Sequence, residues 1–224
     1  MKSIKDDTLF KVNLGLLIIA LLVVIFNSYQ LAQIGQIERS ATGVTANTIA
    51  GTTSSVIPTG VPGIYGSELG ISFDDVSTLD PNKADATIKK LGNLDTSITL
   101  SGADKERYIN VLYKMENGIS CEYCCGARAI IFDNGEPACG CAHSYAMRGL
   151  AKYLLTKHGV EYTDAQILEE VGKWKTLFFP SILQQKAVVL ASKGIELNYI
   201  NLASNKYRGI EKGSAEGGNM VGGC

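Results

Sequence analysis

The chain has 224 residues, of which 46 % are hydrophobic and 19 % are charged, and its formal net charge is -1. This composition excludes a disordered chain and a protein that crosses a membrane many times. The near-neutral charge, without a long basic run, also excludes a nucleic-acid-binding surface, so we expect no nucleic-acid partner. After an anchor and a linker are set aside, about 140 to 150 residues remain, which is the size of one globular domain.

The first predicted element is a transmembrane helix at residues 12–34. No charged residue occurs between Val12 and Leu31, and about 20 uncharged, mainly apolar residues are long enough to cross a hydrocarbon core of ~30 Å. A cleaved signal peptide is the alternative, because the strictly apolar run from Leu14 to Phe26 is short. No small-residue cleavage site follows that run, which favours a retained anchor.

The charges on either side of this segment predict its orientation. Lys2, Lys5 and Lys11 precede it, whereas Arg39 is alone after it, and positive charge is held on the cytoplasmic side. We therefore expect residues 1–11 in the cytoplasm and the rest of the chain outside, in a single-pass protein of the cell membrane. The membrane is then the partner of residues 12–34, and the sequence names no protein partner.

Three further regions follow the predicted anchor. Residues 35–66 are mostly small and polar, which favours a flexible tether. The alternative for this region is a short β-hairpin packed on the domain, with Val56, Ile57, Val61 and Ile64 as strand residues. Residues 67–212 are expected to form the folded domain, and residues 213–224 form a glycine-rich tail that ends in Cys224.

The domain is predicted to be mainly α, a small helical bundle with a short cysteine-bearing β-hairpin. Caps, apolar spacing and stop signals predict five helices. These helices span Pro81 to Gly92, Asp104 to Glu116, His143 or Ser144 to His158, Thr163 to Phe178, and Pro180 to about Ser192. Ala129 to Phe132 is expected to be a strand, with Asp133-Asn134-Gly135 as its turn.

Two cysteine clusters are the sharpest chemical signal. Cys121, Cys124 and Cys125 occur in CEYCCG, and Cys139 and Cys141 occur in CGCAHS. A hairpin between them can bring the thiolates to one ion about 2.3 Å from each sulfur. The set of soft donors suits zinc or copper, and the clusters predict a metal site. The candidate ligands are Cys121, Cys124, Cys125, Cys139, Cys141, His143, Met147 and Cys224.

Some of these residues have simpler interpretations. Met147 also starts an apolar stripe with Leu150 and Leu154, so core packing is the stronger hypothesis for it. His143 is equally well explained as a capping or turn residue. Outside the cytoplasm, six cysteines also suit a structural or interaction domain stapled by disulfides. A third hypothesis is thiol-disulfide redox chemistry at Cys121 and Cys124, although this pair follows a helix and does not open one.

The runs CEYCCG and CGCAHSYAMRGL, within Cys121 to Leu150, resemble membrane-anchored bacterial and archaeal proteins with a PCYCGC-type cysteine motif. Cys139, Cys141 and His143 are the matching positions. The resemblance implies an exported, tethered domain that binds metal.

The sequence predicts a membrane-tethered, extracytoplasmic protein that binds zinc or copper through a two-cluster cysteine site. No common hydrolase, phosphate-loop or zinc-protease motif occurs, which argues against an enzyme.

Overall fold

The computed structural model describes residues 56–124, 126–212 and 220–221. The predicted cytoplasmic segment 1–11 and the predicted anchor 12–34 lie outside these residues, as does most of the tether. Within the described part, no helix combines the length and apolar character that a membrane crossing requires. The anchor therefore remains a prediction from the sequence.

The described part of the chain is mainly helical, as predicted, and contains no extended strand. Its α-helices are α3 (Gly63–Leu69), α4 (Pro81–Ser97), α5 (Gly102–Ile109), α6 (Ala142–His158), α7 (Asp164–Phe178), α8 (Pro180–Ser192) and α9 (Tyr199–Ala203). Short turns of other helix types are the 3-10 turns η1 (Phe73–Asp75), η3 (Met115–Asn117) and η4 (Asn205–Tyr207) and the π turn η2 (Asn110–Lys114).

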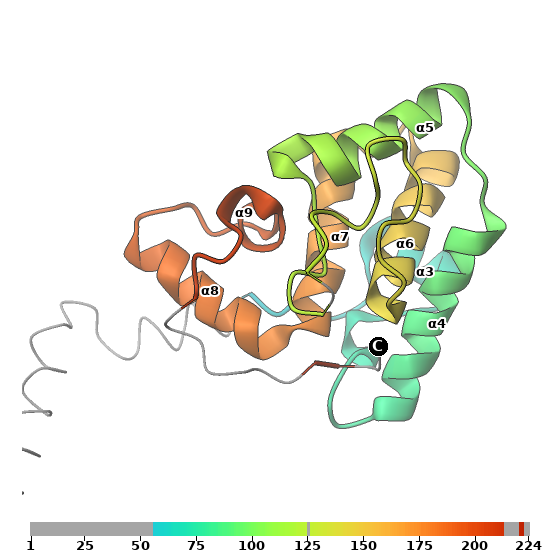
Figure 1. The fold of residues 1–224 in the computed structure, drawn as a ribbon. Helices are drawn as coiled ribbons and strands as arrows, with labels where there is room; N and C mark the ends of the chain where they lie inside the picture. The colour runs from blue at the N-terminus through green and yellow to red at the C-terminus, as the bar shows by residue number, and fades with distance from the viewer. Residues whose placement is uncertain (1–55, 125, 213–219, 222–224) are drawn as a thin grey trace, which may run out of the picture. The chain divides into compact units, whose positions relative to one another are not determined.

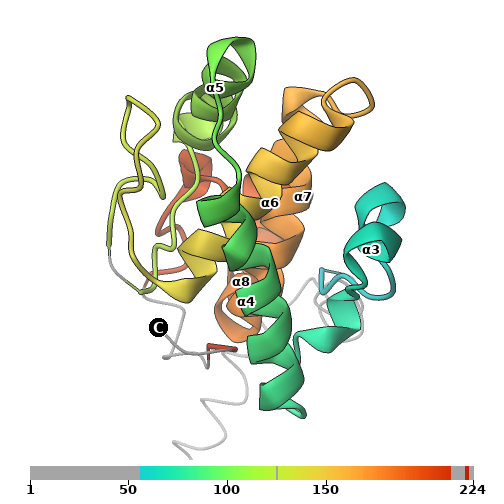
Figure 2. The same cartoon turned by 90° about the vertical axis from the view of Figure 1, so that its right-hand side faces the viewer.

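Helix α6 lies between α4 and α7 in both views of the domain (Figures 1 and 2). Gly149 of α6 sits against the backbone of α4, and a Cβ atom at this position would overlap the Leu91 carbonyl oxygen. The opposite neighbour, α7, contributes the large buried side chains of Trp174 and Phe178. Helix α6 thus packs closely against α4 through a glycine and against α7 through large side chains, which places it at the centre of the core.

The predicted helix starts are confirmed by their capping contacts. The Asp80 carboxylate accepts a hydrogen bond of 3.1 Å from the Lys83 amide at the start of α4, with Pro81 in the first turn. Thr163 and Gln166 form the predicted capping box at the start of α7. These contacts satisfy amide groups that have no partner inside the helix.

Two predicted helix details are wrong. Helix α4 does not stop at Gly92 but continues to Ser97, because Gly92 faces Tyr145 of α6 and its lack of a side chain serves close packing, not termination. The predicted helix 104–116 is regular only to Ile109, after which η2 and η3 carry the chain to Asn117. The predicted stop is confirmed, since Gly118 has a φ of 80°.

The predicted strand Ala129 to Phe132 is also wrong, although its turn is confirmed. The Phe132 amide donates to the Glu136 carbonyl at 2.8 Å, and the Gly135 amide donates to the Phe132 carbonyl at 3.0 Å. Only an isolated bridge joins Ile131 to Pro137. Proline has no amide hydrogen, so a regular ladder cannot be built through it.

Residues 56–66, which the sequence assigns to the tether, pack on the domain without forming the alternative hairpin. Val56 and Tyr65 are buried, and α3 begins at Gly63. The Tyr65 hydroxyl donates to Glu170 at 2.9 Å and accepts from the Trp174 indole at 2.8 Å. Buried apolar and aromatic contacts therefore fix this end of the predicted tether.

We predict that Gly149→Ala lowers the free energy of unfolding by about 1 to 3 kcal/mol, because the new methyl group must push α4 and α6 apart. Gly140→Ala is the matched control, since nothing lies within 4 Å of a Cβ there. Denaturant unfolding followed by circular dichroism measures both. Equal stability of the two variants would contradict the close α4–α6 contact.

Candidate metal centre

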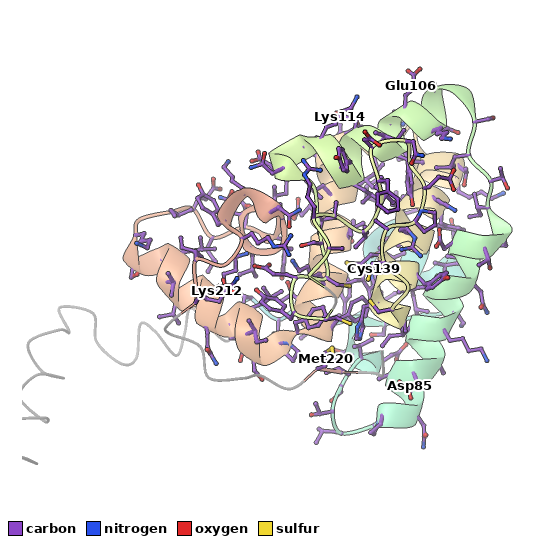
Figure 3. All side chains as sticks on the ribbon, in the orientation of Figure 1. Asp85, Glu106, Lys114, Cys139, Lys212 and Met220 are labelled. Atoms are coloured by element: carbon purple, nitrogen blue, oxygen red, sulfur yellow. The ribbon has the colours of Figure 1, made fainter. Side chains whose placement is uncertain are left out.

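Three cysteines from the two sequence clusters meet in the core. The Sγ atoms of Cys121 and Cys141 are 3.2 Å apart, and those of Cys139 and Cys141 are 3.6 Å apart. All three sulfurs lie within 4.8 Å of one another, and all three residues are buried. Figure 3 labels Cys139 in the loop that runs beside α6. The prediction that both clusters share one point in space is therefore confirmed for these three residues.

Cys141 is placed by the start of α6. It is the N-cap residue of this 17-residue helix, and its sulfur accepts a hydrogen bond from the Ser144 amide at 3.4 Å. The Ser144 hydroxyl lies 3.3 Å from the same sulfur and 3.0 Å from the Cys121 sulfur. Unpaired amides and the helix dipole make this end of the helix favourable for a negatively charged sulfur.

Backbone hydrogen bonds bring Cys121 and Cys139 to the same place from opposite sides of Ile130. The Ile130 amide donates to the Ile119 carbonyl at 2.9 Å, and the Ala138 amide donates to the Ile130 carbonyl at 3.1 Å. The segments that lead into Cys121 and Cys139 therefore flank one central residue.

Arg148 of α6 fixes this arrangement from inside the core. Its Nη1 donates to the carbonyl oxygens of Cys139 at 2.8 Å and Ile130 at 3.2 Å. Its Nε forms a 2.7 Å ion pair with Asp95 of α4, and both side chains are almost fully buried. Lys152 also contacts Asp95 at 2.8 Å. One buried guanidinium group thus joins α4 and α6 to the cysteine loop, the segment that contains Ile130 and Cys139.

His143 faces the C-terminal segment. Its Nε2 lies 2.7 Å from the Val221 carbonyl oxygen, and the Val221 amide donates to the Phe178 carbonyl at 3.0 Å. A carbonyl oxygen can only accept, so Nε2 carries the hydrogen and Nδ1 of the neutral ring keeps its lone pair. Nδ1 is buried without a hydrogen-bond partner in the described residues, but His143 does not belong to the close group of sulfurs.

Of the other predicted ligands, the structure describes Met147 and Cys124. Met147 is fully buried in the apolar core, in agreement with the simpler hypothesis for it. Cys124 is partly buried and lies outside the close group of three. Cys125 and Cys224 lie outside the described residues. No disulfide joins any two of the four cysteines that the structure describes.

The short sulfur contact divides the protons unequally between Cys121 and Cys141. The hydrogen bond from Cys121 lowers the pKa of Cys141 well below its ordinary value, against the effect of burial, and hydrogen bonds from Ser144 act in the same direction. The same hydrogen bond, together with burial, raises the pKa of Cys121. Within the pair, the proton is therefore favoured on Cys121 and the negative charge on Cys141.

A group of buried charges lies next to the sulfurs, and sequence reasoning missed it. Glu122 is flanked by two fully buried lysines, with Nζ to Oε2 distances of 3.4 Å for Lys175 and 3.7 Å for Lys186. Burial lowers the pKa of Lys175 to about 8, although Glu122 opposes this shift. Lys175 also interacts electrostatically with Cys121. The only sequence signal was that both lysines lie among apolar residues of a helix.

The geometry of the three sulfurs suits a metal ion. Thiolates at about 2.3 Å from a tetrahedral ion are about 3.8 Å from one another, and the two short separations of 3.2 and 3.6 Å are close to this value. The three buried cysteines could therefore hold a metal ion.

Comparisons with known proteins give no relative for this chain. No protein family, no curated protein and no solved structure matches it.

We predict that Arg148→Met lowers the free energy of unfolding by about 3 to 5 kcal/mol, because the buried Asp95 carboxylate loses one of its two cationic partners and the Cys139 carbonyl loses the guanidinium donor. Lys83→Met is the control, since it breaks an ion pair with Asp75 in which the lysine is 59 % exposed and should have little effect. Urea denaturation measures both. A loss of stability in Arg148→Met as small as in Lys83→Met would contradict the role of Arg148 in holding this part of the core together.

We also predict that the reduced, metal-free protein contains a thiolate at neutral pH, seen by its ultraviolet absorbance, and that Ser144→Ala raises the pKa of this thiolate because the hydroxyl hydrogen bond to the Cys141 sulfur is lost. Ser192→Ala removes an exposed hydroxyl that contacts only its own helix and should leave the titration unchanged. An unchanged titration in Ser144→Ala would show that the hydroxyl does not stabilise the thiolate.

Proposed function

We propose that this protein is a membrane-tethered, extracytoplasmic protein that binds one zinc or copper(I) ion through Cys121, Cys139 and Cys141. The observation that carries this proposal is the meeting of three buried sulfurs from two separate segments within 4.8 Å.

Thiolate ligands restrict the choice of metal. Sulfur donors favour zinc, copper(I) and iron-sulfur clusters, whereas magnesium and calcium require oxygen donors. Three cysteines with one histidine are also a known ligand set of structural zinc sites. The Nδ1 lone pair of His143 is the added donor in that case, because the Val221 carbonyl holds the opposite nitrogen and so fixes the tautomer.

The neighbouring charges support an anionic metal complex. Three thiolates around one divalent ion carry a net charge of about -1, and this charge is costly to bury unless it is balanced. Lys175 and Lys186 are buried beside Glu122, and Glu211 is a second buried carboxylate that interacts electrostatically with Lys186. Lys175 also interacts electrostatically with Cys121, so its charge can offset part of the negative charge of the complex.

The cellular location rests on the sequence. The uncharged segment at residues 12–34 and the lysines before it support an anchor with its N-terminus inside. The domain that holds the sulfurs would then face the outside of the cell membrane.

The direct test is metal analysis of the full chain in detergent, reduced and then supplied with zinc or with copper(I) under anaerobic conditions. We predict about one bound ion per chain, measured by elemental mass spectrometry after gel filtration. Cys121→Ser, Cys139→Ser and Cys141→Ser should each abolish stoichiometric binding. His143→Gln should weaken zinc binding by about 10- to 100-fold if its Nδ1 joins or supports the ligands.

Cys124→Ser is the matched control, because Cys124 lies outside the close group, and it should bind as the original chain does. Circular dichroism must show that each variant is folded. A folded, fully reduced chain that retains neither metal would contradict the proposed function, and so would unchanged binding in Cys139→Ser.

A further inference from the structure

The closest pair of sulfurs in the site also has the arrangement of a reactive dithiol. Cys121 and Cys141 come from segments separated by 20 positions in the sequence, and their sulfurs are 3.2 Å apart. A disulfide bond is about 2.0 Å long, so a shift of roughly 1 Å would allow the bond to form. The two sulfurs are therefore close enough to bond after a small movement.

The two sulfurs have different surroundings. Cys141 is 8 % exposed and caps α6, where the Ser144 amide and hydroxyl both face its sulfur. Cys121 is 0 % exposed. Thiolates at helix N-termini are the nucleophiles of thiol-disulfide exchange. Cys141 is thus the better nucleophile of the two by its position at the helix start, and Cys121 is the resolving thiol beside it.

We propose that Cys141 and Cys121 undergo reversible disulfide exchange, and that this disulfide and the bound metal are alternative states of one site. The Cys141 thiolate attacks an external disulfide R–S–S–R, forms a mixed disulfide and releases one thiolate, RS⁻. Cys121 then gives up its proton and attacks the Cys141 sulfur, and the second R–S group leaves with this proton as RSH. Two electrons pass from the cysteine pair to the external disulfide, which is reduced to one thiolate and one thiol.

The metal half of this inference rests on the proposed function. The disulfide would consume two of the three clustered sulfurs and leave only Cys139, and a single thiolate cannot hold the ion. Oxidation would therefore release the metal, and reduction by a dithiol would restore the site.

The pairing of Cys121 with Cys141 differs from the redox pair that the sequence suggested. The sequence hypothesis was Cys121 with Cys124, in which neither residue opens a helix. In the structure the helix-opening residue is Cys141. Cys139 is a poorer partner for Cys141, because its sulfur is farther away at 3.6 Å and only one residue separates the two in the chain.

The test uses the full chain in detergent with Cys124, Cys125 and Cys224 changed to Ser, so that only the three clustered cysteines remain. The reduced, zinc-loaded protein is mixed with oxidised glutathione, and free zinc is followed with a chromogenic chelator. We expect about two thiols lost and about one zinc ion released per chain, with Cys121 and Cys141 linked in the non-reducing peptide map. Dithiothreitol should reverse both changes.

Two further substitutions in this background separate the exchange from metal binding. Adding Cys139→Ser should abolish stoichiometric zinc binding but leave disulfide formation intact, whereas adding Cys141→Ser should abolish both. Disulfide formation without zinc binding in the three-cysteine protein would reject the proposed function and the metal half of this inference, but not the exchange. A linkage of Cys139 to Cys141, or zinc release without loss of thiols, would overturn the exchange proposal.

Discussion

The buried guanidinium of Arg148 joins the parts of the protein on which the site depends. It contacts the backbone of the cysteine loop through the carbonyls of Cys139 and Ile130, and it pairs with Asp95 on α4. Buried ion pairs are costly, because both charges lose water, and they persist where the geometry satisfies them. Here the charge does more than pair with a carboxylate, since it also holds in place a loop that lacks regular strand pairing.

The start of α6 is the second element of the site, and it explains why these sulfurs can be both buried and charged. The Ser144 amide and hydroxyl stabilise the Cys141 sulfur, and Lys175 supplies positive charge on the side of Cys121. Such an environment stabilises a thiolate whether it binds a cation or attacks a disulfide. Metal binding and disulfide exchange thus draw on the same local electrostatics, which is why one group of residues can support both proposals.

The local signals in the sequence predicted the helices well, because caps and apolar spacing act over a few residues. Asp80, Thr163 and Pro180 each begin a helix where expected. The errors arose where tertiary contacts decide the outcome. Gly92 looked like a stop signal but serves helix packing, and the strand near Ile131 failed because Pro137 interrupts the pairing.

The site was predicted in part. The spacing of the two cysteine clusters was enough to indicate that Cys121, Cys139 and Cys141 would meet. It could not show that Cys124 lies outside the group, because that depends on how the chain turns after Cys121, where Glu122 has a φ of 38°. Nor could it identify Ser144, Arg148 or Lys175, whose roles arise from contacts between distant segments.

The central claim is that three sulfurs bind one metal ion, and X-ray absorption at the metal edge tests it most directly. For the reduced full chain loaded with zinc, we predict a first shell of about three sulfur atoms at ~2.3 Å, with at most one lighter neighbour. A first shell made only of nitrogen and oxygen would contradict the account, because it would place the ion away from Cys121, Cys139 and Cys141.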